Sequence, residues 1–214
     1  MATKNPKVNT LDAVAVAILA FRANEDKINR LEGGNKDLIR AHFDNTARLE
    51  GALNPVLKEE ALELINALNR RVMMNTLTGT RISEFLVSVN KLLQEDTVHA
   101  SQFGLLAWAP KLYSDIQRTE DARETILGLA VNSNYVGQEG RKVELDFNVI
   151  ACNYIQSYNS FAHTGHDGQG NLITMWTKER IPTGSRIAGR VKAHQRDKRN
   201  ANALVTVLNY VKVL

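Results

Sequence analysis

The chain has 214 residues, of which 43% are hydrophobic and 23% are charged, values typical of soluble globular proteins. Its 13 glycines and four prolines exclude a collagen-like or low-complexity chain, and the single cysteine, Cys152, excludes a fold built on intramolecular disulfides. The net charge of +4 is unevenly distributed, because residues 1–130 carry 16 basic and 17 acidic side chains whereas residues 131–214 carry 11 and six. A basic half of this kind favours a polyanionic partner.

The apolar residues predict neither a membrane-spanning helix nor a secretion signal. The longest apolar run, Ala13 to Phe21, has nine residues, about half of what a spanning helix needs. Lys4 and Lys7 precede this run, but Asp12 interrupts the approach to it and no cleavage site follows. The lone cysteine agrees with a reducing compartment. We therefore expect a soluble, cytoplasmic protein that has no membrane partner.

The first 131 residues are predicted to form a helical domain, because their apolar residues recur every three or four positions. In chain order the predicted helices cover about residues 11–32, 37–49, 55–75, 82–93, 100–117 and 119–131. Thr10 is the expected N-cap of the first helix, and Asn54 followed by Pro55 marks the start of the third. Pro110 is expected to kink or split the fifth helix, and Thr119 to cap the last one.

Near residue 132 the hydrophobic period changes to the strict alternation that is typical of half-buried strands. Strands are predicted over residues 143–149, 154–164, 172–177, 186–194 and 203–213, with turns at residues 166–171 and 181–184. Five short strands in so few residues favour a closed barrel over an open sheet with exposed edges. The predicted fold class is therefore α+β, with an N-terminal helical domain at 1–131 and a C-terminal five-stranded β-barrel at 132–214.

The order of motifs in the second half resembles an OB-like β-barrel domain that is found at the C-terminus of phage and mobile-element proteins. A glycine-containing lead at Tyr135–Arg141 precedes the first strand, and a glycine-rich turn at Asp167–Asn171 leads to Trp176. A Gly-Arg-Val-Lys-Ala-His strand at 189–194 follows, and the last strand continues from Thr206. The resemblance covers residues 133–214. It implies an OB-like barrel of the type that binds single-stranded nucleic acid.

OB barrels hold oligonucleotides across one face, with cations along the phosphates and rings on which bases stack. The predicted binding residues are Arg180, Arg186, Arg190, Lys192, Arg196, Lys198, Arg199, Tyr154, Tyr158 and Trp176. On the fourth predicted strand, alternation places the cations on one face with Ala188 and His194, and turns Ile187, Gly189, Val191 and Ala193 into the barrel. By the same rule Tyr154 and Tyr158 share a face. Two alternatives stay open, namely that the rings fill the core and that the basic segment is only a solvated surface.

No pattern in the sequence predicts catalysis or a cofactor. His163, His166 and Cys152 do not complete the four nitrogen and sulfur ligands of a zinc site, so we interpret them as part of a polar hairpin. The sequence has no phosphate-binding G-x-x-x-x-G-K-[ST] loop, no G-x-S-x-G elbow and no H-E-x-x-H helix.

The leading hypothesis is a non-catalytic protein that binds single-stranded DNA or RNA, with DNA as the first choice, in the replication or recombination of a phage or mobile element. The helical domain would self-associate or dock on a replication or recombination protein, and a phage-encoded chain would act in the host cytoplasm. The alternative is a structural or interaction protein, such as a virion component or an inhibitor of a host factor, whose barrel binds protein. Salt separates the two hypotheses, because nucleic-acid binding weakens steeply as salt rises.

Overall fold

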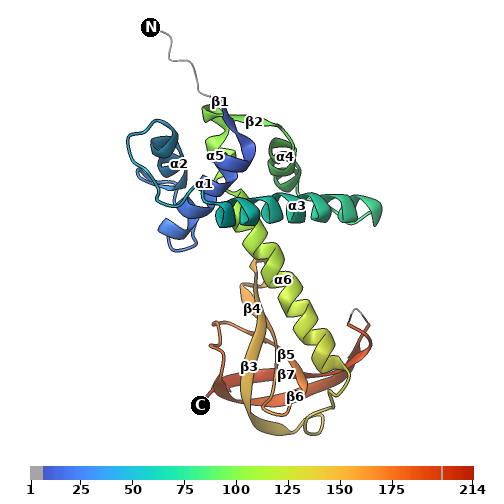
Figure 1. Ribbon diagram of the computed structural model, residues 1–214. Coiled ribbons are helices and arrows are strands. Elements are labelled where there is room, and N and C mark those ends of the chain that lie inside the picture. The colour runs from blue at the N-terminus through green and yellow to red at the C-terminus, as the bar shows by residue number, and fades with distance from the viewer. Residues whose placement is uncertain (1–6, 199) are drawn as a thin grey trace. The chain divides into compact units, whose positions relative to one another are not determined.

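The computed structural model describes residues 7–198 and 200–214 and divides into two compact units, Met1–Gln117 and Arg118–Leu214. The elements in chain order (Figure 1), with 3₁₀ helices written η, are β1 (Lys7–Asn9), α1 (Thr10–Ala23), α2 (Asn35–Phe43), α3 (Pro55–Leu77), α4 (Glu84–Leu93), β2 (Thr97–His99), η1 (Ala100–Gln102), α5 (Phe103–Leu106), α6 (Ala109–Ala130), β3 (Lys142–Ile155), η2 (Gln156–Tyr158), β4 (Ser160–His166), β5 (Leu172–Thr177), β6 (Ser185–Asp197) and β7 (Ala203–Val213). The predicted α+β class, with N-terminal helices and a C-terminal five-stranded sheet, is confirmed. Within the described ranges, none of the helices has both the length and the apolar character needed to cross a bilayer.

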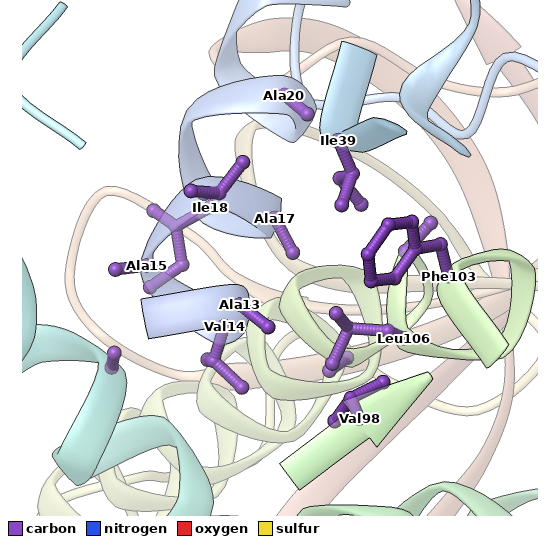
Figure 2. Close-up of a cluster of buried hydrophobic side chains, with 14 of the residues drawn as sticks. Ala13, Val14, Ala15, Ala17, Ile18, Ala20, Ile39, Val98, Phe103 and Leu106 are labelled. Atoms are coloured by element: carbon purple, nitrogen blue, oxygen red, sulfur yellow. The ribbon is translucent and has the colours of Figure 1, made fainter. Parts of the chain in front are cut away.

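Helix α1 is the centre of the first unit and is buried on almost all sides. Figure 2 shows its small side chains, among them Ala13, Ala17 and Ala20, next to Phe103 and Leu106 from α5. Because alanine adds little volume, neighbouring elements pack closely around this helix. Asn9, not Thr10, is its N-cap, and the Asn9 side chain accepts a hydrogen bond from the Asp12 backbone N–H.

The helix boundaries agree with the sequence where a strong local signal exists. Helix α3 begins at Pro55, and the Asn54 Oδ1 atom accepts a hydrogen bond from the Leu57 N–H at 2.7 Å, as predicted. Helix α1 ends at Ala23, about three turns before the predicted stop, because Glu25 and Asp26 adopt left-handed φ angles of 55° and 57°.

Two expectations about the last helix were wrong. Pro110 is the second residue of α6 and lies in its first turn, so it does not kink the helix. Backbone N–H groups in the first turn of a helix have no acceptor within the helix, so the N–H that proline lacks is not missed there. The helix then continues to Ala130 through Thr119, which therefore is not an N-cap.

The five strands of the second unit form a sheet that closes on itself in the order β3-β4-β5-β7-β6. The first half of β3 pairs with β6 and the second half with β4; β5 and β7 are parallel, and the other neighbours are antiparallel. The second predicted strand needs correction, because β4 begins at Ser160. Tyr154 belongs to β3, and Tyr158 lies in the 3₁₀ turn between them.

The interior of this closed sheet is filled by apolar residues from its strands, and Phe147 is fully buried there. Gly165 on β4 makes room for this ring, because a Cβ atom at Gly165 would lie 2.7 Å from the Phe147 ring and 2.2 Å from the Asn148 carbonyl oxygen. On β6, Ile187 and Val191 are buried while Arg190 is exposed, which confirms the predicted alternation for this part of the strand.

Beyond Val191 the predicted alternation on β6 fails. A register shift between Val191 and Ala193 leaves Lys192 without a direct partner on β7 and places Ala193 opposite Val207. His194 consequently lies opposite Thr206, whose side chain is buried. A β-bulge of this kind reverses the faces of all residues that follow it, so His194 does not share the face of Arg190.

The last turns of α6 belong to the second unit. Ile126, Leu129 and Ala130 pack against the buried side chains of Leu172, Ala203 and Val205, and form a small core outside the closed sheet. Burial of these apolar side chains stabilises the attachment of the helix end to β5 and β7.

We predict that Leu129→Ala lowers the free energy of unfolding of the second unit by about 2 kcal/mol, because it removes contacts to this outer core. Leu127→Ala is the matched control, since Leu127 is 36% exposed and should cost less than about 0.5 kcal/mol. Urea unfolding followed by Trp176 fluorescence in a Trp108→Phe background measures both. Equal losses of unfolding free energy for the two substitutions would show that the contacts of Leu129 do not specifically stabilise the second unit.

Candidate nucleic-acid interface

Two pairs of aromatic rings lie at the β3–β4 hairpin. The Tyr154 and Phe161 rings are 5.1 Å apart at directly opposed positions of β3 and β4. The Tyr158 ring meets the Trp176 indole edge-on at 5.6 Å, with an interplanar angle of 89°. Because the chain leaves the strand at Gln156, Tyr154 and Tyr158 fall into different pairs, and the predicted shared face of these two tyrosines is wrong.

The two ring pairs occupy opposite faces of the sheet. Trp176 follows Met175, which is fully buried inside the closed sheet, so the indole points outward. Phe161 is two residues from the buried His163 and shares its face, and the opposed Tyr154 does so as well. Only the pair formed by Tyr158 and Trp176 therefore extends to the outer surface.

All three predicted binding rings are solvent-accessible. Tyr154 is 53% exposed, Tyr158 67% and Trp176 51%. These rings therefore do not form the core, where Phe147 is the buried aromatic residue. Exposed aromatic faces on neighbouring elements are the surface on which nucleic-acid bases stack.

The strand registers place Trp176 in one row with basic residues of the other strands. Met175 and Leu208 are the last pair of the β5–β7 register, and Trp176 and Asn209 are the residues that come directly after this pair on the two parallel strands. Asn209 pairs with Arg190 on β6, which in turn pairs with Lys142 on β3. With strands spaced by about 4.8 Å, the row from Trp176 to Lys142 is about 14 Å long. We call Trp176, Asn209, Arg190 and Lys142 the outer row.

At the basic end of the outer row a pocket of about 430 Å³ opens on the surface. It is lined by Lys142, Ala188, Gly189, Arg190, Tyr210 and Lys212. The small Ala188 side chain leaves space there, and the cations Lys142, Arg190 and Lys212 surround it. Such a pocket is suited to an anionic ligand.

Tyr210 reaches this pocket because of a β-bulge. Ala188 pairs with Lys212 and Arg190 with Asn209, so two residues of β7 oppose the single residue Gly189. Tyr210 has a φ of 51°, an uncommon angle for a residue other than glycine, and its ring is 78% exposed. The Arg190 guanidinium carbon lies 6.0 Å from the ring centre, within reach of a cation–π contact.

The other predicted cations are distributed around the second unit. Arg186 lies 3.8 Å from Glu144 and opposite Asp146, so carboxylates offset its charge. Arg180 is exposed in the β5–β6 connection, and Lys192 is exposed at the bulge between Val191 and Ala193.

The most basic part of the predicted site is remote from the rings. Arg196 and Lys198 are exposed at the β6–β7 hairpin. Along β6 this hairpin is about 20 Å from Arg190, at the end of the sheet opposite to the β3–β4 hairpin. Arg199 lies outside the described residues.

Of the six residues that line the pocket, only Arg190 was among the predicted binding residues, and Lys142, Tyr210 and Lys212 are the large side chains that the prediction omitted. Lys142 begins the first strand of the sheet, and Tyr210 and Lys212 end the last one. A basic residue at a strand end is a weak signal, and only the cross-strand registers bring these three together. A third cation that the prediction omitted, Lys178, lies beside the rings, where its Nζ atom donates to the Tyr158 and Asn159 carbonyl oxygens at 3.4 Å.

The histidines near the hairpin have structural contacts. His163 is 1% exposed and its Nε2 atom lies 2.9 Å from the Thr177 hydroxyl. Burial lowers the pKa of His163, and the nearby positive charge of Arg180 lowers it further. The carboxylate of Asp167 accepts hydrogen bonds from the backbone N–H groups of Gln169 and Asn171 and so shapes the turn. In the described part of the chain, no group of three or more His, Cys, Asp or Glu side chains could hold a metal ion.

Comparisons with known protein families, with curated proteins and with solved structures give no match to this chain.

We predict that lowering the pH from about 7.5 to about 5.5 destabilises the second unit through His163. The pKa of His163 in the folded protein lies below the value of about 6.5 expected in the unfolded chain, so the unfolded state binds more protons as the pH is lowered. The free energy of unfolding therefore decreases when the pH decreases. Urea unfolding at several pH values should give a smaller loss for His163→Gln than for the parent. Parallel curves for the two proteins would contradict this assignment.

Proposed function

We propose that this chain binds single-stranded nucleic acid, with DNA as the first choice, across the outer row and without catalysing a reaction. The role that we infer is in replication or recombination of a phage or mobile element. An OB-type barrel suits this proposal, because such barrels are small, five-stranded and bind oligonucleotides across one face. The closed sheet, whose first strand pairs with both the second and the fourth, agrees with that fold.

The observation that carries the proposal is that rings and cations follow one another along the outer surface of the closed sheet. The Tyr158–Trp176 pair lies at one end of the outer row, and the pocket with Tyr210 lies at the other. A nucleic-acid strand that follows the outer row around the closed sheet would stack bases on these rings while its phosphates approach Arg190 and Lys142. Stacking contributes about 1–3 kcal/mol per base and depends little on base identity.

The charges of the pocket are available to a ligand. Among the described residues, no carboxylate forms an ion pair with Lys142, Arg190 or Lys212, whereas the nearby Arg186 is paired with Glu144. Cations without an internal partner can neutralise phosphates and release condensed counterions, which is the main source of affinity for single strands.

We predict that replacing Arg190 and Lys212 by Ala weakens binding to oligo(dT) and flattens its salt dependence. The slope of log K against log salt should lose about 0.7 for each phosphate contact removed. The matched control is the double replacement of Arg196 and Lys198, which keeps the same change in net charge but lies at the far hairpin. Fluorescence anisotropy at several salt concentrations measures both variants.

Equal losses in the two double variants would mean that only the overall charge matters, which contradicts a site at the outer row. Absence of any oligonucleotide binding by the parent at low salt would favour the alternative in which the barrel binds protein.

We predict that Trp176→Ala and Tyr158→Ala each weaken oligo(dT) binding by about 1–3 kcal/mol, because each removes a stacking surface. Tyr154→Ala is the matched control, since this ring is similarly exposed but faces the other side of the sheet. Thermal melting should show that all three variants remain folded. An equal or larger loss of affinity for Tyr154→Ala would mean that the strand binds the face that carries Tyr154, which contradicts binding across the outer row.

A further inference from the structure

Two cations face each other directly at the basic end of the outer row. Lys142 on β3 is paired with Arg190 on β6, and both side chains are exposed. Like charges at directly opposed positions of antiparallel strands destabilise a sheet. Four pairs further along the same two strands, Asp146 is paired with Arg186, which is the favourable combination. The pair of Lys142 and Arg190 is therefore a cost that an anion bound between the two side chains would remove.

Lys212 on β7 completes a group of three cations around the pocket. Lys212 is paired with Ala188, which lies two residues before Arg190 and on the same face of β6. From the strand spacing and the rise per residue, the Cα atoms of Lys142 and Lys212 are about 12 Å apart. Because lysine side chains are long and flexible, all three cations can contact one group that lies above Ala188. We call Lys142, Arg190 and Lys212 the cation cluster.

The acidic side chains nearest to the cation cluster are engaged elsewhere. Glu144 is paired with Ala188, but its carboxylate lies 3.8 Å from Arg186 and does not line the pocket. Glu139, in the turn before β3, accepts a hydrogen bond from the His194 backbone N–H at 2.7 Å. In the described part of the chain no carboxylate forms an ion pair with the cation cluster. The three charges are therefore left for an external anion.

The cation cluster lies where the outer row ends. The pairs between β3 and β4 begin at Asn148, so within the described sheet the row does not continue beyond Lys142. In the other direction the row leads through Asn209 to Trp176. A single strand that follows the row from Trp176 toward Lys142 therefore makes its last contact at the pocket.

A terminal phosphate differs from the phosphates inside a strand in its charge and in its free oxygens. An internal phosphodiester carries one negative charge, whereas a phosphate monoester carries about 1.5 to 2 near pH 7 and has three acceptor oxygens. Three cations without a carboxylate partner match the monoester better than they match one diester. The pocket of about 430 Å³ also has room beside the phosphate, and the Tyr210 ring that lines it is 78% exposed.

We propose that the cation cluster binds the terminal phosphate of a single strand, so that the protein recognises an end of the nucleic acid. This inference rests on the proposed function, because the strand reaches the pocket along the outer row. The phosphate would lie above Ala188 among the three cations, and the terminal base would contact the ring of Tyr210. The direction of the strand decides whether a 5′-phosphate or a 3′-phosphate enters the pocket, so only one of the two ends is recognised.

Three oligonucleotides of about eight thymidines, within the site size of one OB-type barrel, test the proposal. One carries a 5′-phosphate, one a 3′-phosphate and one hydroxyl groups at both ends, and each is labelled on an internal base. Fluorescence anisotropy with the full chain should show at least tenfold tighter binding when the phosphate is at one end. A phosphate at the other end should give less than a twofold gain. Since the two phosphorylated oligonucleotides have equal charge, this difference cannot come from charge alone.

Three variants locate the effect in the pocket. Lys212→Gln should lower the tenfold gain to threefold or less, because it removes one charge from the cation cluster. Lys198→Gln is the matched control, since it removes the same charge at the far hairpin, and it should keep the full gain. Ala188→Leu keeps all three charges but fills the space between them, and it should also lower the gain. The gain is a ratio of two affinities of the same protein, so partial unfolding of a variant cannot mimic its loss.

Inorganic phosphate, titrated alone by calorimetry, should bind at least tenfold more weakly than the preferred phosphorylated oligonucleotide. Equal affinities would identify free phosphate as the ligand and overturn the proposal. No gain from either phosphate, an equal gain from both, or a loss of the gain in Lys198→Gln as large as in Lys212→Gln would also overturn it. Binding of the hydroxyl-ended oligonucleotide in these cases would leave the proposed function intact, whereas failure of all three oligonucleotides to bind at low salt would overturn both proposals.

Discussion

The double pairing of β3 is the constraint on which the second unit depends. Residues 142–147 of this strand pair with β6, and residues 148–155 pair with β4. One long strand thereby closes the sheet, so that no edge of the sheet stays open for pairing with another chain. Closure also separates the side chains strictly into an inner set around Phe147 and an outer set. The register of the same strand brings Lys142 opposite Arg190 and so defines the basic end of the outer row.

Three irregularities in the registers modify this simple pattern. The first, between Val149 and Ala151, lies next to the point where β3 changes partner. The second directs Tyr210 to the outer surface, and the third turns His194 so that its ring stacks on Tyr135 at 4.4 Å. Bulges re-aim side chains and are frequent beside functional sites. Here the second bulge adds a ring to a row that otherwise has only one, Trp176.

Much of the fold could be predicted because its signals are local. The bounds of β5 and β7 agree with the predicted strands, since alternating residues and turn residues delimit both segments. The start of α3 is similarly marked by Asn54 and Pro55. The start of β4 was misplaced, because β3 continues to Ile155 and no glycine or proline between Ile150 and Ser160 marks the turn at 156–158 in the sequence.

The candidate site was harder to predict than the fold because it depends on contacts between distant residues. The rings and cations could be found by residue type, but which of them share a surface depends on registers between strands. Arg190 gains Lys142 and Tyr210 as neighbours only through pairings across β3 and β7. Arg196 is close to Arg190 in sequence, yet it lies toward the opposite end of the sheet.

The most direct test of the outer row is the fluorescence of Trp176 during an oligo(dT) titration of Trp108→Phe protein, in which Trp176 is the one remaining tryptophan. If a base stacks on the indole, its emission falls to a plateau, and the midpoint moves to higher oligonucleotide concentration as salt is added. Unchanged Trp176 emission, while a labelled oligonucleotide is seen by anisotropy to be fully bound, would contradict the account.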